Sequence, residues 1–162
     1  MTDVIARDFD VFCHVLRDTV CLFDEMITFE NDKLDAVAAN DVEALDHRMH
    51  EEQAYLMKMK ALDAKRETLQ EKLGVAGVPL LQITEQYEGD EKESLLTLYD
   101  DLSEKSAELK ESIATTKKII DLHITSIAYL LERLEGKHAT YNKDGELEDN
   151  ADPPKRFKSR KA

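Results

Sequence analysis

The chain has 162 residues, which corresponds to one domain, and its 35 Asp and Glu outnumber its 22 Lys and Arg to give a net charge of −13. An acidic chain of this kind repels phosphate groups, which argues against nucleic-acid binding. No window approaches the roughly 18 to 20 apolar residues of a membrane span, which argues against stable membrane insertion. The N-terminus, "MTDVIARDFD", lacks the apolar run of a secretory signal, so we expect a cytoplasmic protein.

Apolar residues recur at intervals of three or four along the first 27 residues, which predicts a long first helix. They are Ile5, Phe9, Phe12, Leu16, Val20, Phe23 and Ile27. Thr2 or Asp3 can cap the start of this helix, and the pattern fades toward Val37. The composition also favours long helices, because the chain has only five Gly and three Pro.

Cys13 and Cys21 lie on this first helix, eight residues or about 12 Å apart, which is too far for a disulfide. The adjacent His14 is the histidine nearest to a thiol, and its side chain leaves the helix in a different direction. We therefore expect two buried thiols in a reducing compartment and no thiol catalysis.

The stretch "AANDVEAL" interrupts the helical pattern at residues 38–45 and predicts a tight turn. Asn40 or Asp41 is a suitable N-cap for a second helix. Apolar residues then continue at helical spacing to Leu73, and Gly74 provides a left-handed helix end at little cost. Because the connection is short, the first two helices should run antiparallel.

Two loops divide the middle of the chain. "GVAGVP" (74–79) precedes a short third helix in "LLQITEQY" (80–87), and "EGDEKES" (88–94) is predicted as another break. A last long helix then carries a near-heptad apolar seam and ends at Gly136. The seam residues are Leu95, Leu98, Leu102, Leu109, Ile113, Thr116, Ile120, Ile127, Leu130 and Leu134. This seam could pair within one chain or between two chains, so a homo-oligomer stays open.

Together these elements predict an all-α fold, an antiparallel helical bundle or coiled-coil hairpin of three long helices and one short helix. Residues 1–136 are expected to form a single elongated helical domain. Residues 137–162 are polar and turn-rich, end in the basic stretch "KRFKSRKA", and are expected to form a mobile C-terminal tail.

Few residues suggest a metal or catalytic site. His47 and His50 share a helix face in "DHRMHEE", but zinc needs further ligands and a solvated polar face explains these residues better. A di-iron bundle needs two Glu-x-x-His pairs, and the one present, Glu135 to His138, straddles the helix-ending Gly136. The sequence has no phosphate-binding loop and no nucleophile elbow. We therefore expect a binding protein rather than an enzyme, with no cofactor and no metal.

Three short stretches follow one another in a particular order: "ANDVEAL" at the first turn, "EKLG" at the end of the second helix, and "TYNKDG" after the last helix. In this order they resemble the FlgN-type flagellar export chaperones, which are small, acidic, cytoplasmic proteins with antiparallel helices. The resemblance spans roughly residues 1–147. In "KKIIDLHITSIAYLLERLEG" (117–136) it rests on apolar spacing alone, since many members have Asn-containing turns there.

The resemblance implies a chaperone of flagellar type III export that binds the C-terminal helical segments of hook–filament junction (hook-associated) proteins. Such a chaperone prevents premature association of its clients and delivers them to the export gate. The working end of the family is the last helix and the tail, which makes Ile120, Ile124, Ile127 and Leu131 the expected client-binding residues. The alternative for these four residues is ordinary intramolecular core.

The resemblance also implies a role for Tyr141, in "TYNKDG", as the residue that docks on the export gate component. Tyrosine suits docking because it has a broad apolar ring, a polar tip and few torsions to order. The alternative is that Tyr141 folds back on the helix ends. For the chain as a whole, the second hypothesis is a structural or adaptor coiled-coil protein of another system.

Overall fold

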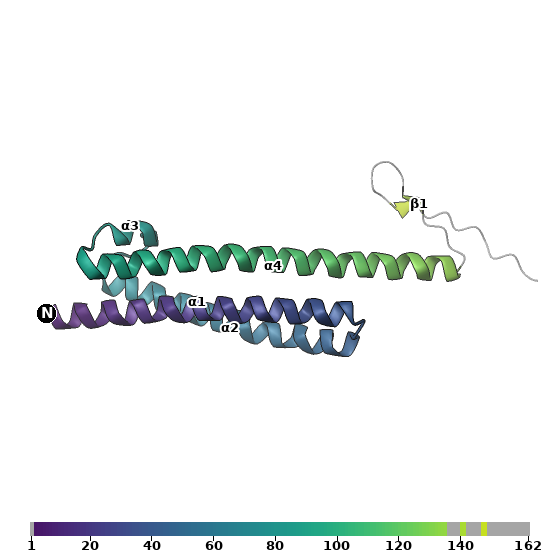
Figure 1. The fold of residues 1–162 in the computed structure, drawn as a ribbon, viewed down its shortest axis with the longest axis horizontal. Coiled ribbons are helices and arrows are strands. Elements are labelled where there is room, and N and C mark those ends of the chain that lie inside the picture. The colour runs from purple at the N-terminus through teal and green to yellow at the C-terminus, as the bar shows by residue number, and fades with distance from the viewer. Residues whose placement is uncertain (1, 136–139, 142–146, 149–162) are drawn as a thin grey trace, which may run out of the picture. The chain divides into compact units, whose positions relative to one another are not determined.

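The computed structural model describes residues 2–135, 140–141 and 147–148, with side chains for residues 5–134. Within these ranges the chain forms four helices and two very short strands (Figure 1). They are α1 (Thr2–Ala38), α2 (Val42–Lys72), α3 (Leu80–Thr84), α4 (Gly89–Glu135), β1 (Thr140–Tyr141) and β2 (Leu147–Glu148). The prediction of an all-α fold with three long helices and one short helix is confirmed.

Contacts between Cα atoms divide the chain into two compact units, Met1–Ile119 and Ile120–Ala162. Helix α4 runs through the boundary, so its first 31 residues belong to the first unit and its last 16 to the second. The predicted helical domain of residues 1–136 and the predicted mobile tail of residues 137–162 stay predictions. Most of that tail lies outside the described residues.

The turn between α1 and α2 forms as the sequence predicts. Asp41 is the N-cap of α2, and its Oδ1 accepts a hydrogen bond from the Ala44 amide at 2.9 Å. Asn40 adopts a left-handed conformation with φ of 52°, which Asn tolerates better than most residues. At the other end of α2, the φ of Gly74 is 74°, which confirms the predicted left-handed helix end.

The break predicted at "EGDEKES" is shorter than expected, because only Glu88 of this stretch lies outside a helix and α4 already begins at Gly89. Gly89 has a φ of 59°, a conformation that glycine adopts without strain. Asp90 and Glu91 occupy the first turn, where negative charge is favourable beside the free amides of the helix start. Polar residues at this position therefore start the helix rather than interrupt it.

Within Met1–Ile119, side-chain pairs define the directions of the long helices. Lys33 of α1 lies 3.2 Å from Glu52 of α2, and Glu25 lies 3.9 Å from Lys58, so α1 and α2 run antiparallel as predicted. Asp24 of α1 lies 2.9 Å from Lys105 of α4. Further along both helices, the backbone carbonyl of Glu30 accepts a hydrogen bond from the Thr116 hydroxyl, so α1 and α4 run parallel. Figure 1 shows these helices side by side.

The core of this unit consists of two apolar clusters. The first joins all four helices and the loop after α2, with Ile83 and Leu95 fully buried at its centre. Phe9 packs against Tyr87 in this cluster, with ring centroids 4.8 Å apart. The second cluster consists of Leu22, Met26, Ile27 and Leu109, with Phe23, Tyr55, Met59 and Leu62 packed against it. Burial of these side chains supplies most of the free energy that holds α4 on α1 and α2.

A charged layer follows the second cluster along α1. The Lys33 ammonium is buried and contacts the carboxylates of Glu30, at 3.1 Å, and Glu52, at 3.2 Å. Glu30 is also buried, and its Oε2 has no hydrogen-bond partner among the described residues. Thr116 of α4 is buried beside this layer and donates to the backbone carbonyl of Ser112 at 2.9 Å.

The prediction of two buried thiols is half right. Cys13 is buried in the first apolar cluster, whereas Cys21 is exposed. The two residues lie on different sides of α1, since eight residues correspond to about 800° of rotation, or 80° beyond two full turns.

Candidate protein-binding surface

The last turns of α4 have a sequence that favours helix formation. Residues 120–135 contain no Gly or Pro and are rich in Leu, Ile and Glu, which keep helical geometry at little cost. The hydroxyls of Thr125 and Ser126 donate to the carbonyls of Asp121 and Leu122, each at 2.9 Å. These local bonds satisfy the two hydroxyls without a partner from another element.

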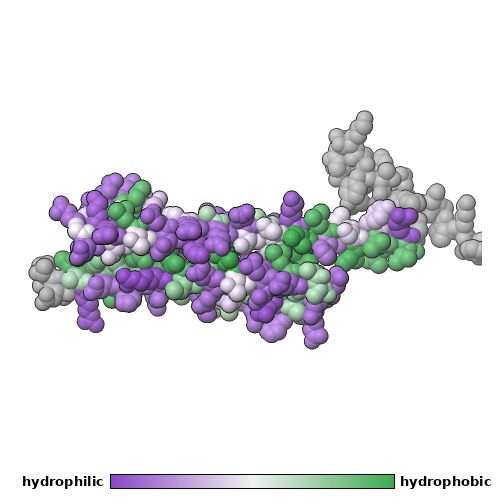
Figure 2. All heavy atoms as spheres, viewed as in Figure 1, coloured by the Kyte–Doolittle hydropathy of each residue, from purple (hydrophilic) through white to green (hydrophobic). Residues whose placement is uncertain are grey.

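The four predicted client-binding residues lie on one side of this helix. Ile124, Ile127 and Leu131 expose 60%, 56% and 51% of their surface, and Ile120 is half-buried. The spacing of four, three and four residues puts them in one stripe, and Leu134 extends it by three more residues. We call Ile120, Ile124, Ile127, Leu131 and Leu134 the α4 stripe. Figure 2 shows hydrophobic residues gathered over the last turns of α4.

The α4 stripe follows the inward positions of α4 along the same helix. From Leu95 to Ser112 the inward positions of α4 are spaced alternately three and four residues apart. Thr116 follows Ser112 after four residues, and both Ile119 and Ile120 are half-buried beyond it. From Asp121 to Leu131 every side chain is exposed, and this change lies at the boundary between the two compact units at Ile119.

Other exposed apolar residues lie outside the stripe. Leu122 and Tyr129 are seven residues apart, roughly half a turn around the helix from the stripe, and each exposes more than half of its surface. The Arg133 guanidinium donates to the Tyr129 hydroxyl at 3.2 Å. The sequence predicted neither residue as part of a surface, because a seam analysis selects a single phase and disregards apolar residues on the opposite face.

The seam prediction is wrong at four positions of α4. Ile113 was expected in the seam but exposes 42% of its surface, and the neighbouring Ser112 takes the inward position. Ile127, Leu130 and Leu134 were expected there too, but they expose 56%, 58% and 83% of their surface. Ile113 was chosen because it is apolar, although the three-and-four spacing from Leu95 selects Ser112, and the other three residues keep an apolar spacing that does not record what covers them.

Tyr141 lies in β1, at the point where the backbone forms a short antiparallel ladder with β2. Thr140 pairs with Glu148 and Tyr141 pairs with Leu147. The sequence "NKDG", predicted as a turn, and the basic "KRFKSRKA" stretch lie outside the described residues. The role of Tyr141 in docking stays a prediction.

His47 and His50, the weighed metal ligands, are both exposed on α2. The His50 Nδ1 lies 2.8 Å from the Asp46 carbonyl, and the His47 Nε2 lies 4.0 Å from Glu51. In the described part of the chain, no three His, Cys, Asp or Glu side chains converge in a way that would hold a metal ion. The described helices also include none with the length and hydropathy of a membrane span.

Comparisons with known proteins agree with this arrangement. The sequence matches the family described as FlgN protein over residues 8–149, which include all of α2, α3 and α4 and most of α1. Neither the comparison with curated proteins nor the comparison with solved structures gives a match. Because the family match covers most of the chain, the protein belongs to the FlgN family of flagellar export chaperones.

Proposed function

We propose that this protein acts in the cytoplasm and binds the C-terminal helical segments of hook-associated junction proteins, prevents their premature association and delivers them to the export gate. The observation that carries the proposal is the α4 stripe. Three of the four expected client-binding residues, Ile124, Ile127 and Leu131, expose more than half of their surface within the chain. This exposure supports a client surface over the alternative of intramolecular core.

A client helix suits this surface for physical reasons. An amphipathic helix buries its apolar face when it lies along an apolar stripe, and the contact positions recur at three and four residues. The terminal segments of the clients would otherwise associate with one another through the same apolar faces. Because the stripe covers only about four helical turns, the affinity stays moderate enough for release at the gate.

The role proposed for Tyr141 is to dock on the export gate component. Its backbone pairing with Leu147 places it in a short hairpin that follows the client-binding helix in sequence. The variant Tyr141→Ala is expected to leave client binding and thermal stability unchanged and to weaken binding to the gate component. A lower melting temperature in this variant would favour the alternative, in which Tyr141 folds back on the helix ends.

Co-purification tests the client proposal most simply. The full chain is mixed with a hook-associated junction protein, either intact or lacking its C-terminal segment. We expect the intact protein to be retained and the shortened protein to be lost. Retention of both forms would contradict the proposed binding mode, and retention of neither would favour an adaptor role in another system.

A further inference from the structure

The two edges of the α4 stripe differ in chemistry. Asp121 and Glu132 each follow a stripe residue, Ile120 and Leu131, by one position. Successive residues are about 100° apart around a helix, so both carboxylates flank the stripe on the same side. They are eleven residues apart, which corresponds to about three helical turns or about 17 Å along the axis. We call Asp121 and Glu132 the acidic edge.

The opposite edge of the stripe carries no carboxylate. Leu130 precedes Leu131 by one position, so it lies on the other side of the stripe, and it exposes 58% of its surface. His123, seven residues earlier, continues this edge and is also exposed. The stripe is therefore broadened by an apolar side chain along one edge and bounded by negative charge along the other.

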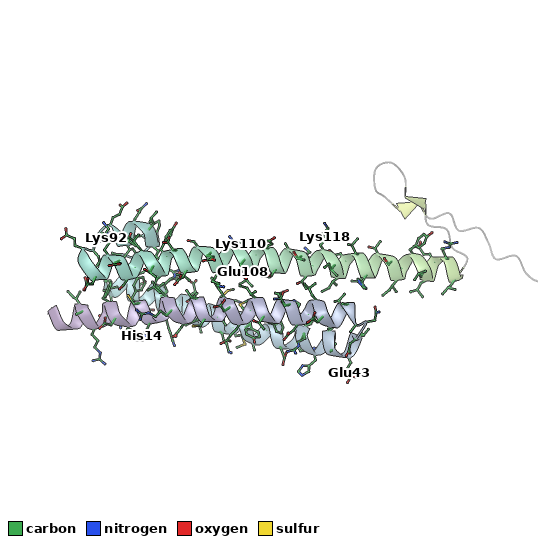
Figure 3. The ribbon with its side chains drawn as sticks, viewed as in Figure 1. His14, Glu43, Lys92, Glu108, Lys110 and Lys118 are labelled. Carbon is green, nitrogen blue, oxygen red and sulfur yellow. The ribbon has the colours of Figure 1, made fainter. Side chains whose placement is uncertain are left out.

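The acidic edge lacks counter-charges within its own chain. The sequence of residues 120–132 contains no Lys or Arg. Neither carboxylate of the acidic edge forms an ion pair with another described residue. Glu108 differs in this respect: Figure 3 shows it between α4 and α1, and its carboxylate lies 3.1 Å from the Lys105 ammonium. Unpaired carboxylates beside an exposed apolar stripe favour a partner with positive charge at the matching positions.

We propose that the client segment that binds the α4 stripe is an amphipathic helix with Lys or Arg along one flank and apolar side chains along the other. Its cations face Asp121 and Glu132, and its apolar flank covers Leu130. This inference rests on the proposed function, because it describes the chemistry of the client for that same surface. Apolar contact along the stripe contributes most of the affinity, and the acidic edge selects among helices of similar hydrophobicity.

The acidic edge also fixes how the client helix lies on α4. A client that rotates about its own axis, or slides by one turn, can keep much of its apolar contact with the stripe. Both movements separate the charges, because two cations about three turns apart must lie opposite Asp121 and Glu132 at the same time. The charges therefore determine the register of the client helix.

Charge reversal at the acidic edge tests the inference. A hook-associated junction protein is titrated by calorimetry into the D121K/E132K variant at about 50 mM and about 500 mM NaCl. At the lower salt concentration we expect the affinity to fall by about tenfold or more, because like charges then face one another. At the higher salt concentration the loss should shrink to about threefold or less, because exposed charges are screened. L130Q should lower the affinity by about fivefold at both concentrations, because salt does not screen the apolar contact that it removes.

A matched control reverses two carboxylates elsewhere on α4. Asp100 and Glu111 are also eleven residues apart, and both are exposed. D100K/E111K carries the same change of net charge as D121K/E132K, and its affinity should stay within about threefold of the wild-type value. Urea denaturation of each variant shows that it is folded.

Two outcomes would overturn the inference and leave the proposed function intact. One is wild-type affinity of D121K/E132K at low salt while I124Q/I127Q binds the client weakly. The other is an equal loss of affinity in D121K/E132K and D100K/E111K, which would show that net charge rather than the acidic edge decides. Wild-type affinity of L130Q would contradict the apolar flank of the client. Wild-type affinity of I124Q/I127Q would instead contradict the proposed function, and this inference with it.

Discussion

At the scale of single residues, Lys33 shows how a charge is kept inside the helical core. Its ammonium lies between the carboxylates of Glu30 and Glu52 and 5.6 Å from the ring centroid of Phe29. Burying one lysine with two carboxylates is tolerable only because the opposite charges compensate for lost hydration. Sequence reasoning did not find this layer, because Glu30 and Lys33 resemble any exposed charged pair three residues apart on a helix.

Replacing Lys33 by Met should destabilise the fold by about 3 kcal/mol, because the Glu30 carboxylate then remains buried without its counter-charge. The double variant E30Q/K33M should recover most of that loss, since neither charge remains. Urea denaturation measures both effects. The control K58M removes an exposed lysine and should change stability by less than about 0.5 kcal/mol. Equal stability of K33M and the wild type would contradict the account of this layer.

The two cysteines make a second prediction at this scale. Burial raises the pKa of the Cys13 thiol, so at pH 8 less of it is thiolate than for an ordinary cysteine. Cys21 is exposed. A thiol reagent should therefore modify Cys21 first and leave Cys13 protected until the protein unfolds. Mass spectrometry of the singly labelled protein identifies the site, and labelling of Cys13 at the same rate would show that the first apolar cluster opens readily.

At the scale of elements, α4 combines two kinds of helix in one continuous run. Up to Thr116 its inward side chains are buried or half-buried within the first unit, and from Asp121 to Leu131 every side chain is exposed. Apolar spacing predicted that the helix exists, continues to Gly136 and carries a stripe at its end. It could not predict which part of the stripe has a partner, because periodicity records the phase of apolar residues and not what covers them.

Stability measurements should separate the two parts of α4. The variant I124Q/I127Q should change the free energy of unfolding by less than about 0.5 kcal/mol, because both side chains are exposed and Gln favours helix well. Leu95→Ala should cost about 3 kcal/mol, because Leu95 is fully buried and its truncation leaves a cavity. Comparable losses in the two variants would show that the α4 stripe is part of the core.

At the scale of the whole molecule, a strongly acidic chain exposes a continuous apolar stripe. Net negative charge keeps such a chain apart from its own copies and from nucleic acid at long range. Short-range complementarity then decides what binds the stripe, for which a client helix is proposed above. The composition predicted the acidic helical protein, and the family resemblance supplied the client. The hollows lined by both α1 and α2 were missed because they require residues 11–25 and 58–72 to be neighbours, which only the fold shows.

The central claim, that the α4 stripe binds the client, is tested most directly by calorimetric titration of a hook-associated junction protein into two variants. I124Q/I127Q removes two stripe residues, and L122Q/Y129Q removes two residues of similar exposure on the opposite face. The account predicts that I124Q/I127Q lowers the affinity for the junction protein by about 30-fold or more, as expected for central interface residues. The affinity of L122Q/Y129Q should stay within about threefold of the wild-type value. Equal affinities for I124Q/I127Q and the wild type, with both chains folded, would contradict it.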